Sequence, residues 1–278
     1  MITRDELGGL YDFENQNGLV IKSIGQATES PEALVRFLGR YTSWNGFFGS
    51  GVATLAGKIG RSRGFFRDGE EPITPLADRS VLVASFFFDA ARDEFDDRDT
   101  THRDSHRCLA QATVKGTVDF FKIGAKAMDL LADPLWLRAL QDRVRVGYGD
   151  GTSDDLPAIF RAVGYHLGSE LLADKEFSLL DRTLRDKQLA LVTYLESAKV
   201  TIAGQEHIAY AWVRIHSGHG GGAEADHFKW ATQGVVRAYQ YTANGLHDAM
   251  RHQLHLGFVD FSRDHREFFE RVGDSSPQ

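Results

Sequence analysis

The chain has 278 residues, a formal net charge of −7 and a sequence pI of about 5.9. A chain of this length hides roughly three quarters of its unfolded surface on folding, so it can bury a substantial core. The acidic balance argues against nucleic acid as a partner, because neutralising phosphates requires a basic surface. The single cysteine, Cys108, excludes an internal disulfide framework and is typical of a reducing cytoplasm.

No stretch of the sequence predicts export or membrane insertion. The first residues lack the basic start and apolar run of a signal peptide. The longest apolar run, 81–88, is interrupted by Ser85 and falls well short of the roughly 20 residues of a membrane span. We therefore expect a cytoplasmic protein without a membrane partner.

Helical signals dominate the chain from its first third onward. Residues 1–29 hold scattered glycines and are expected to be loosely ordered. Ser30 and Pro31 then supply an N-cap and a first helical position, and apolar residues follow at helical spacing. Residues 60–77 are rich in glycine and proline and predict a loop, and the body of the next helix is expected at 81–95.

The second half of the chain repeats this pattern after a polar break at 96–101. Further helices are expected at 106–123, 135–145, 156–177, 184–198 and 235–258. Alternating strand patterns with hairpin turns are nearly absent, and a disordered tail is expected at 273–278. The sequence thus predicts a single all-α domain over 30–272, a bundle of about seven helices whose centre can host a metal.

The stretch 215–231 is the most informative part of the chain for chemistry. It contains His216, His219 and His227 together with carboxylates, and three glycines lie between the second histidine and the first acid. Imidazole and carboxylate together suit a divalent transition metal, above all iron where oxygen needs an open position. Glu224 and His227 also share one helical face, as ligands do in diiron bundles. The alternative is a glycine-rich surface loop whose histidines have no role.

Two earlier clusters could deliver further ligands. Glu94 lies in apolar company, and either His106, which opens a helical stripe, or His102 could join it. Glu170 is also set among apolar residues, and a buried carboxylate is costly without a cation nearby. His166, one turn before Glu170, is either a donor that orients this carboxylate or a core histidine.

Other polar residues are expected to have no part in a site. Glu176 is expected on the outside, paired with a neighbour, and Cys108 cannot pair with the nearby His106 on one helix face. No other candidate ligands are grouped around the remaining histidines, which are His207, His247, His252, His255 and His265.

Three motifs resemble the haem-oxygenase-like diiron oxidases, relatives in fold of haem oxygenase and of pyrroloquinoline-quinone synthase. The motifs are Glu94-Phe95-Asp96-Asp97 leading to His106, Gly168-Ser169-Glu170, and His219 followed by Glu224-Ala225-Asp226-His227 and Trp230-Ala231. Together they span residues 86–231 of the chain.

The resemblance implies a seven-helix domain with a central dinuclear iron site that activates dioxygen against amino-acid-like or fatty-acid substrates. The implied ligands of two Fe(II) ions are Glu94, His106, Glu170, His219, Glu224 and His227. Two departures leave alternatives open. His219 lies one residue too far from the acid, so His216 could replace it, and the long gap after Glu94 keeps His102 in contention.

We therefore expect a non-haem diiron oxidoreductase that uses dioxygen on a small amino-acid-like substrate in a biosynthetic pathway. C–H oxidation, desaturation, cyclisation and N-oxygenation remain open, as do the electron source and a homodimer. The expected pocket walls are Phe86, Phe87, Phe88, Trp212 and Trp230. Arg214 or Arg237 is expected to bind an acidic substrate. The alternatives are a ferritin-like iron protein and a metal-free binder or cofactorless oxidase of the same fold.

Overall fold

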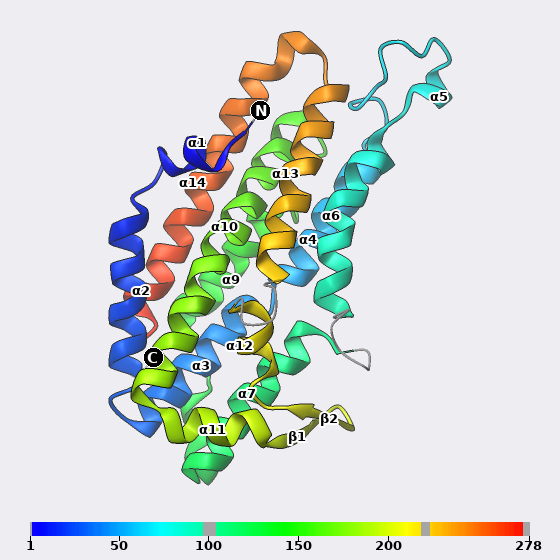
Figure 1. Ribbon diagram of the computed structural model, residues 1–278. Coiled ribbons are helices and arrows are strands. Elements are labelled where there is room, and N and C mark those ends of the chain that lie inside the picture. The colour runs from blue at the N-terminus through cyan, green and yellow to red at the C-terminus, as the bar shows by residue number, and fades with distance from the viewer. Residues whose placement is uncertain (1, 97–103, 218–222, 275–278) are drawn as a thin grey trace.

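The computed structural model describes residues 2–96, 104–217 and 223–274. These residues are mostly helical, with one small antiparallel hairpin, which confirms the all-α prediction in its coarse form. Most of the longer helices run along the long axis of an elongated bundle (Figure 1). Across the described ranges, none of the helices combines the length and apolar content that crossing a bilayer requires.

The elements in chain order are α1 (Arg4–Gly8), α2 (Phe13–Ala27), α3 (Pro31–Asn45), α4 (Phe48–Arg61), α5 (Thr74–Ala77), α6 (Ser80–Phe95), α7 (His106–Phe121), η1 (Gly124–Lys126), α8 (Ala127–Leu130), α9 (Leu135–Gly147), α10 (Leu156–Lys187), α11 (Leu189–Ser197), β1 (Lys199–Ile202), β2 (Gln205–Ile208), α12 (Ala211–His216), α13 (Ala223–Tyr241), η2 (Asn244–Leu246) and α14 (His247–Arg271).

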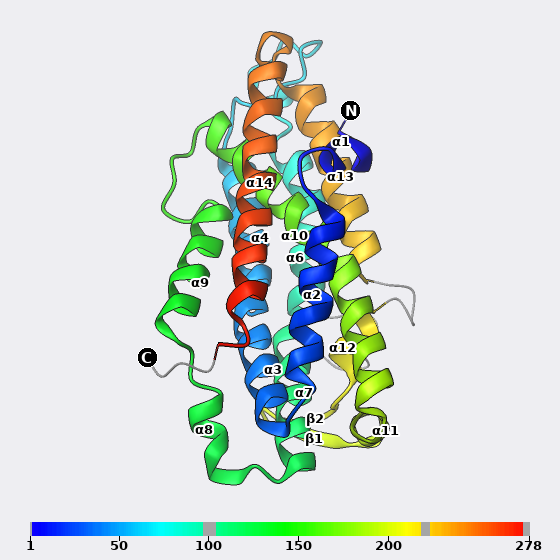
Figure 2. The same cartoon turned by 90° about the vertical axis from the view of Figure 1, so that its left-hand side faces the viewer.

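The longest helix, α10, is the centre of the bundle and contacts α2, α4, α9, α12, α13 and α14. Its tightest contact is with α14, which lies between α9 and α2 in Figure 2. A Cβ at Gly164 would lie 1.9 Å from the Leu254 carbonyl oxygen, and one at Gly257 would lie 1.8 Å from that of Arg161. Glycine is required at both positions because the two helix backbones touch there.

Local signals set several helix starts as predicted. The Ser30 hydroxyl accepts from the Ala33 backbone N–H at 3.1 Å, with Pro31 in the first turn of α3. Ser105 caps α7 in the same way, and Asp155 caps α10. The last of these helices continues to Lys187 rather than ending near residue 177.

The N-terminal region differs from the prediction, because residues 4–8 and 13–27 are helical rather than loosely ordered. Asp12 caps α2, which contacts α10 and α14 and buries Val20 and Ile24. The scattered glycines are tolerated because tertiary packing of the apolar face outweighs their weak helix propensity.

Two further elements were not expected. The predicted C-terminal helix is broken at 242–246, around Asn244 and Gly245, and its two parts form α13 and α14. A hairpin of β1 and β2 turns at Ala203 and Gly204, which have φ values of 51° and 83°. Positive φ at both central residues is the conformation that joins two-residue hairpins.

Candidate metal centre

Three side chains from different helix ends converge on one point. Glu94 lies at the end of α6, His106 opens α7 and His216 ends α12. His106 Nδ1 lies 3.1 Å from Glu94 Oε1 and 3.2 Å from His216 Nε2. One ligand atom from each residue fits within a mutual distance of 4.8 Å, so the group could hold a metal ion.

His216 is oriented for coordination by its own helix. Its Nδ1 lies 2.7 Å from the Trp212 carbonyl oxygen, which can only accept, so Nδ1 carries the proton and Nε2 keeps its lone pair. Burial lowers the pKa of His216 to about 3, and the neighbouring charge of His106 acts in the same direction. His216 therefore presents the neutral imidazole that metal binding requires.

Glu94 is ionised despite its position. Burial alone would raise the pKa of this carboxyl group, but the charge of His106 and the hydrogen bond from its ring outweigh burial and hold the pKa at about 2. The group thus combines a carboxylate with imidazoles, the donor set favoured by divalent iron or zinc.

A second polar group lies beside the first and is centred on Glu170 of α10. Its Oε2 lies 3.4 Å from His227 Nδ1, and its Oε1 lies 3.3 Å from His166 Nδ1. Asp93 accepts from His227 Nε2 at 2.9 Å, which leaves Nδ1 of that ring facing Glu170. Burial lowers the pKa of His166, and its Nε2 has no hydrogen-bond partner among the described residues.

The two groups are close neighbours. The rings of His106 and His227 are nearly parallel, with centroids 6.2 Å apart and an interplanar angle of 25°. Glu94 and Glu170 also line the same cavity. One cavity wall therefore carries carboxylates from α6 and α10.

This cavity has a volume of about 330 Å³. Its lining residues are Thr42, Asn45, Gly46, Phe48, Gly49, Ser50, Glu94, Phe95, Ser105, His106, Arg107, Ala110, Ser169, Glu170, Ala173, Phe177, Trp212 and His216. Among these described lining residues, Arg107 is the only lysine or arginine. It donates to the Thr42 carbonyl oxygen at 2.7 Å and forms no ion pair with a described residue. The cavity therefore offers a candidate metal-binding group, a cation that has no ion-pair partner among the described residues, and aromatic walls.

The predicted ligands divide into those that the structure brings together and those outside the described residues. Glu94, His106, Glu170 and His227 lie in the two neighbouring groups. His102 and His219 fall outside the described residues. Glu224 belongs to α13, but its side chain is not described. His216, the alternative to His219, is the histidine found beside His106.

The predicted substrate arginines lie elsewhere. Arg214 is exposed on α12, and Arg237 is exposed on α13, where it donates to Gln240 Oε1 at 2.7 Å. Neither lines the cavity, and of the five expected aromatic walls only Trp212 does. The sequence analysis did not select Arg107 as a substrate-binding residue, although it directly follows the candidate ligand His106.

Glu176, His207 and His265 are buried and paired, which the sequence did not predict. Glu176 is buried rather than outside, and its Oε2 lies 2.5 Å from Nε2 of the buried His265. His207 is also buried, with Nδ1 3.0 Å from Asp104 Oδ1. The sequence around these residues does not show which distant helix covers them. Of the five dismissed histidines, only His252 is exposed.

Comparison with family models, curated proteins and solved structures finds no match to this chain.

Proposed function

We propose that this protein is a non-haem iron oxidoreductase that uses dioxygen to oxidise a small organic substrate. The observation that carries the proposal is the convergence of Glu94, His106 and His216 on the wall of a 330 Å³ cavity. Three protein donors leave coordination positions open to the cavity, as a 2-His-1-carboxylate set does in oxygen-activating iron enzymes.

A second iron is part of the proposal and is supported by the group around Glu170. His227 offers Nδ1 next to this carboxylate, and Asp93 fixes its tautomer. Among the described residues, Nε2 of the buried His166 has no hydrogen-bond partner, and this spare donor capacity supports a further ion on this side. We further propose that Glu224 and His219 complete the ligand set within a haem-oxygenase-like bundle.

Iron would supply the activation of dioxygen, and the chain would bind and orient the substrate. Arg107 would hold a carboxylate of the substrate, because it lines the cavity and forms no ion pair with another described residue. Phe48, Phe177 and Trp212 would pack on the apolar part and exclude water. We propose a substrate that combines a carboxylate with an apolar or amine-bearing body, which fits the amino-acid-like class that the family resemblance implies.

The geometry favours this function over a ferritin-like role. The three converging donors come from helix ends at α6, α7 and α12, whereas storage bundles carry ligands on continuous helices. A cavity-lining arginine that has no ion pair among the described residues also has no evident purpose in iron storage.

Metal analysis tests the proposal directly. The purified protein is loaded with Fe(II) under anaerobic conditions, desalted and analysed for iron per chain. We expect two ions in the wild type, loss of iron in Glu94→Ala, and full loading in His252→Ala, whose side chain is exposed. Admission of oxygen should then produce a transient visible absorption. A protein that binds no iron would refute the proposal and favour a metal-free member of the fold.

A further inference from the structure

A chain of buried polar side chains lies behind the metal centre and has no part in the function proposed above. Tyr41 donates to Glu176 Oε1 at 2.5 Å, and Glu176 Oε2 faces His265 Nε2 at the same distance. His265 Nδ1 lies 2.6 Å from Gln16 Nε2, and the Gln16 amide oxygen accepts from Tyr11 at 2.6 Å. This series of hydrogen bonds thus joins α3, α10, α14 and α2, and runs from the fully buried Tyr41 to the half-buried Tyr11.

Glu176 is placed to accept a proton from Tyr41. It is 4 % exposed, and none of the described lysines or arginines forms an ion pair with it. The hydrogen bond from the Tyr41 hydroxyl to Glu176 Oε1 gives the phenolic proton an acceptor within reach. His265 and Gln16 extend the hydrogen-bonded path, so the proton can be shared toward the surface.

The ring of Tyr41 faces the metal centre through an aromatic contact. Its centroid lies 5.3 Å from that of Trp212, and Trp212 lies 6.1 Å from the ring of His216. The Trp212 carbonyl also accepts the hydrogen bond from His216 that orients this ligand. Phe177 fills the space between them, stacked on His216 at 4.5 Å. Tyr41 therefore has an electron path on one side and a proton acceptor on the other.

We propose that Tyr41 is a redox-active residue of this protein, an inference that rests on the proposed function. In the absence of substrate, Tyr41 gives one electron through Trp212 to the oxidant that dioxygen generates in the cavity. Its phenolic O–H bond breaks, and the proton passes to Glu176. The products are a neutral tyrosyl radical and a protonated Glu176. A small-molecule one-electron reductant such as ascorbate returns the electron, and Glu176 returns the proton. The relay protects the metal-binding imidazoles from oxidation when no substrate is bound.

The experiment uses iron-loaded, substrate-free protein that is mixed with oxygen and freeze-quenched for electron paramagnetic resonance. We expect a tyrosyl radical signal that narrows when the protein is grown with ring-deuterated tyrosine. Tyr41→Phe should abolish it, and Tyr194→Phe, which removes a half-exposed hydroxyl on α11, should leave it intact. Glu176→Gln keeps the size of the side chain but cannot hold the carboxylate proton, and should also lower the signal strongly.

A second readout separates a relay from a purely structural network. The decay of the visible transient should slow in Tyr41→Phe and in Trp212→Phe, while both variants still bind iron. If iron binds and oxygen is consumed, but the transient decays at the wild-type rate in Tyr41→Phe and no tyrosine signal forms, this inference is wrong and the proposed function stands. If no iron binds or no oxygen is consumed, both fail together.

Discussion

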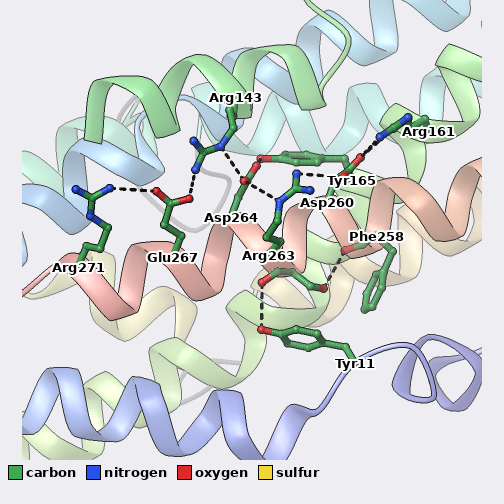
Figure 3. Close-up of polar contacts among 11 residues, drawn as sticks. Tyr11, Arg143, Arg161, Tyr165, Phe258, Asp260, Arg263, Asp264, Glu267 and Arg271 are labelled. Atoms are coloured by element: carbon green, nitrogen blue, oxygen red, sulfur yellow. Dashed lines mark hydrogen bonds and ion pairs between the residues drawn. The ribbon is translucent and has the colours of Figure 1, made fainter. Parts of the chain in front are cut away.

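The molecule contains two clusters of buried or partly buried carboxylates that are neutralised in different ways. In the contact between α9, α10 and α14, shown in Figure 3, the carboxylates pair with arginines. Arg143 Nε donates to Asp264 at 2.9 Å, and Arg161 pairs with Asp260 at 2.6 Å. In the candidate metal centre, the ion-pair partners of Glu94 and Glu170 among the described residues are histidines.

This difference gives the two clusters different capacities for chemistry. A guanidinium group keeps its charge at any pH that a folded protein tolerates, so its ion pairs are permanent. An imidazole can release its proton, and the same nitrogen can then bind a metal ion next to the carboxylate. Histidines also face Glu176 and Asp104, so it is the convergence of Glu94, His106 and His216 on one point that marks the α6, α7 and α12 ends as the candidate functional region.

The largest effect should come from removing a donor in the histidine region. His216→Ala leaves Glu94 and His106 without their third donor, and we expect Fe(II) affinity to fall by more than about 100-fold, beyond the 10- to 100-fold typical of residues that only orient ligands. Isothermal titration under anaerobic conditions measures this. If His216→Ala binds Fe(II) with wild-type affinity, His216 is not a metal ligand.

The arginine region should show the opposite behaviour. Asp264 accepts from Arg143 and from Tyr165, and burial raises its pKa although Arg143 opposes that change. Asp264→Asn weakens these hydrogen bonds, so we expect the free energy of unfolding to fall by about 1–3 kcal/mol. Urea denaturation measures the loss. Iron stoichiometry should stay at the wild-type value, and a drop in it would break the distinction between the two clusters.

Arg107 provides a test of the cavity itself. Removing its guanidinium should weaken binding of a carboxylate probe such as 3-phenylpropionate by about tenfold, the equivalent of one charge-assisted hydrogen bond. The change in tryptophan fluorescence on titration reports binding, because Trp212 lines the cavity. Arg214→Ala and Arg237→Ala are matched controls and should bind the probe normally. If either control variant loses as much affinity for the probe, that arginine and not Arg107 alone binds the carboxylate.

The smallest effect concerns the ion pair that ties α1 to α14. Hydrogen bonds from Arg251, opposed by burial and reinforced by His255, lower the pKa of Glu6 to about 2. A lowered carboxyl pKa stabilises the folded state above about pH 4.5, and this contribution disappears as the pH falls toward 2. Glu6→Gln should therefore cost up to about 1 kcal/mol at pH 7 and nothing near pH 2. Glu14→Gln, which changes an exposed carboxyl group on α2, is the control, and equal losses in both variants would contradict the assignment.

The sequence by itself determined the features that depend on neighbours within a few positions. Ser30 and Pro31 start α3, and Ser105 starts α7, because a cap bonds backbone groups within the same turn. Glu94 and Glu170 stood out because their apolar neighbours made a surface position unfavourable.

Only the tertiary structure decided which of these side chains meet. His106 and His216 are 110 positions apart and touch because α7 and α12 pack together. Glu176 and His265 were assigned to no site because each is buried by a helix that is remote in sequence. Capping and periodicity act within one helix, whereas a site requires several helices to pack together. Local sequence patterns do not identify which helix surface packs against which other.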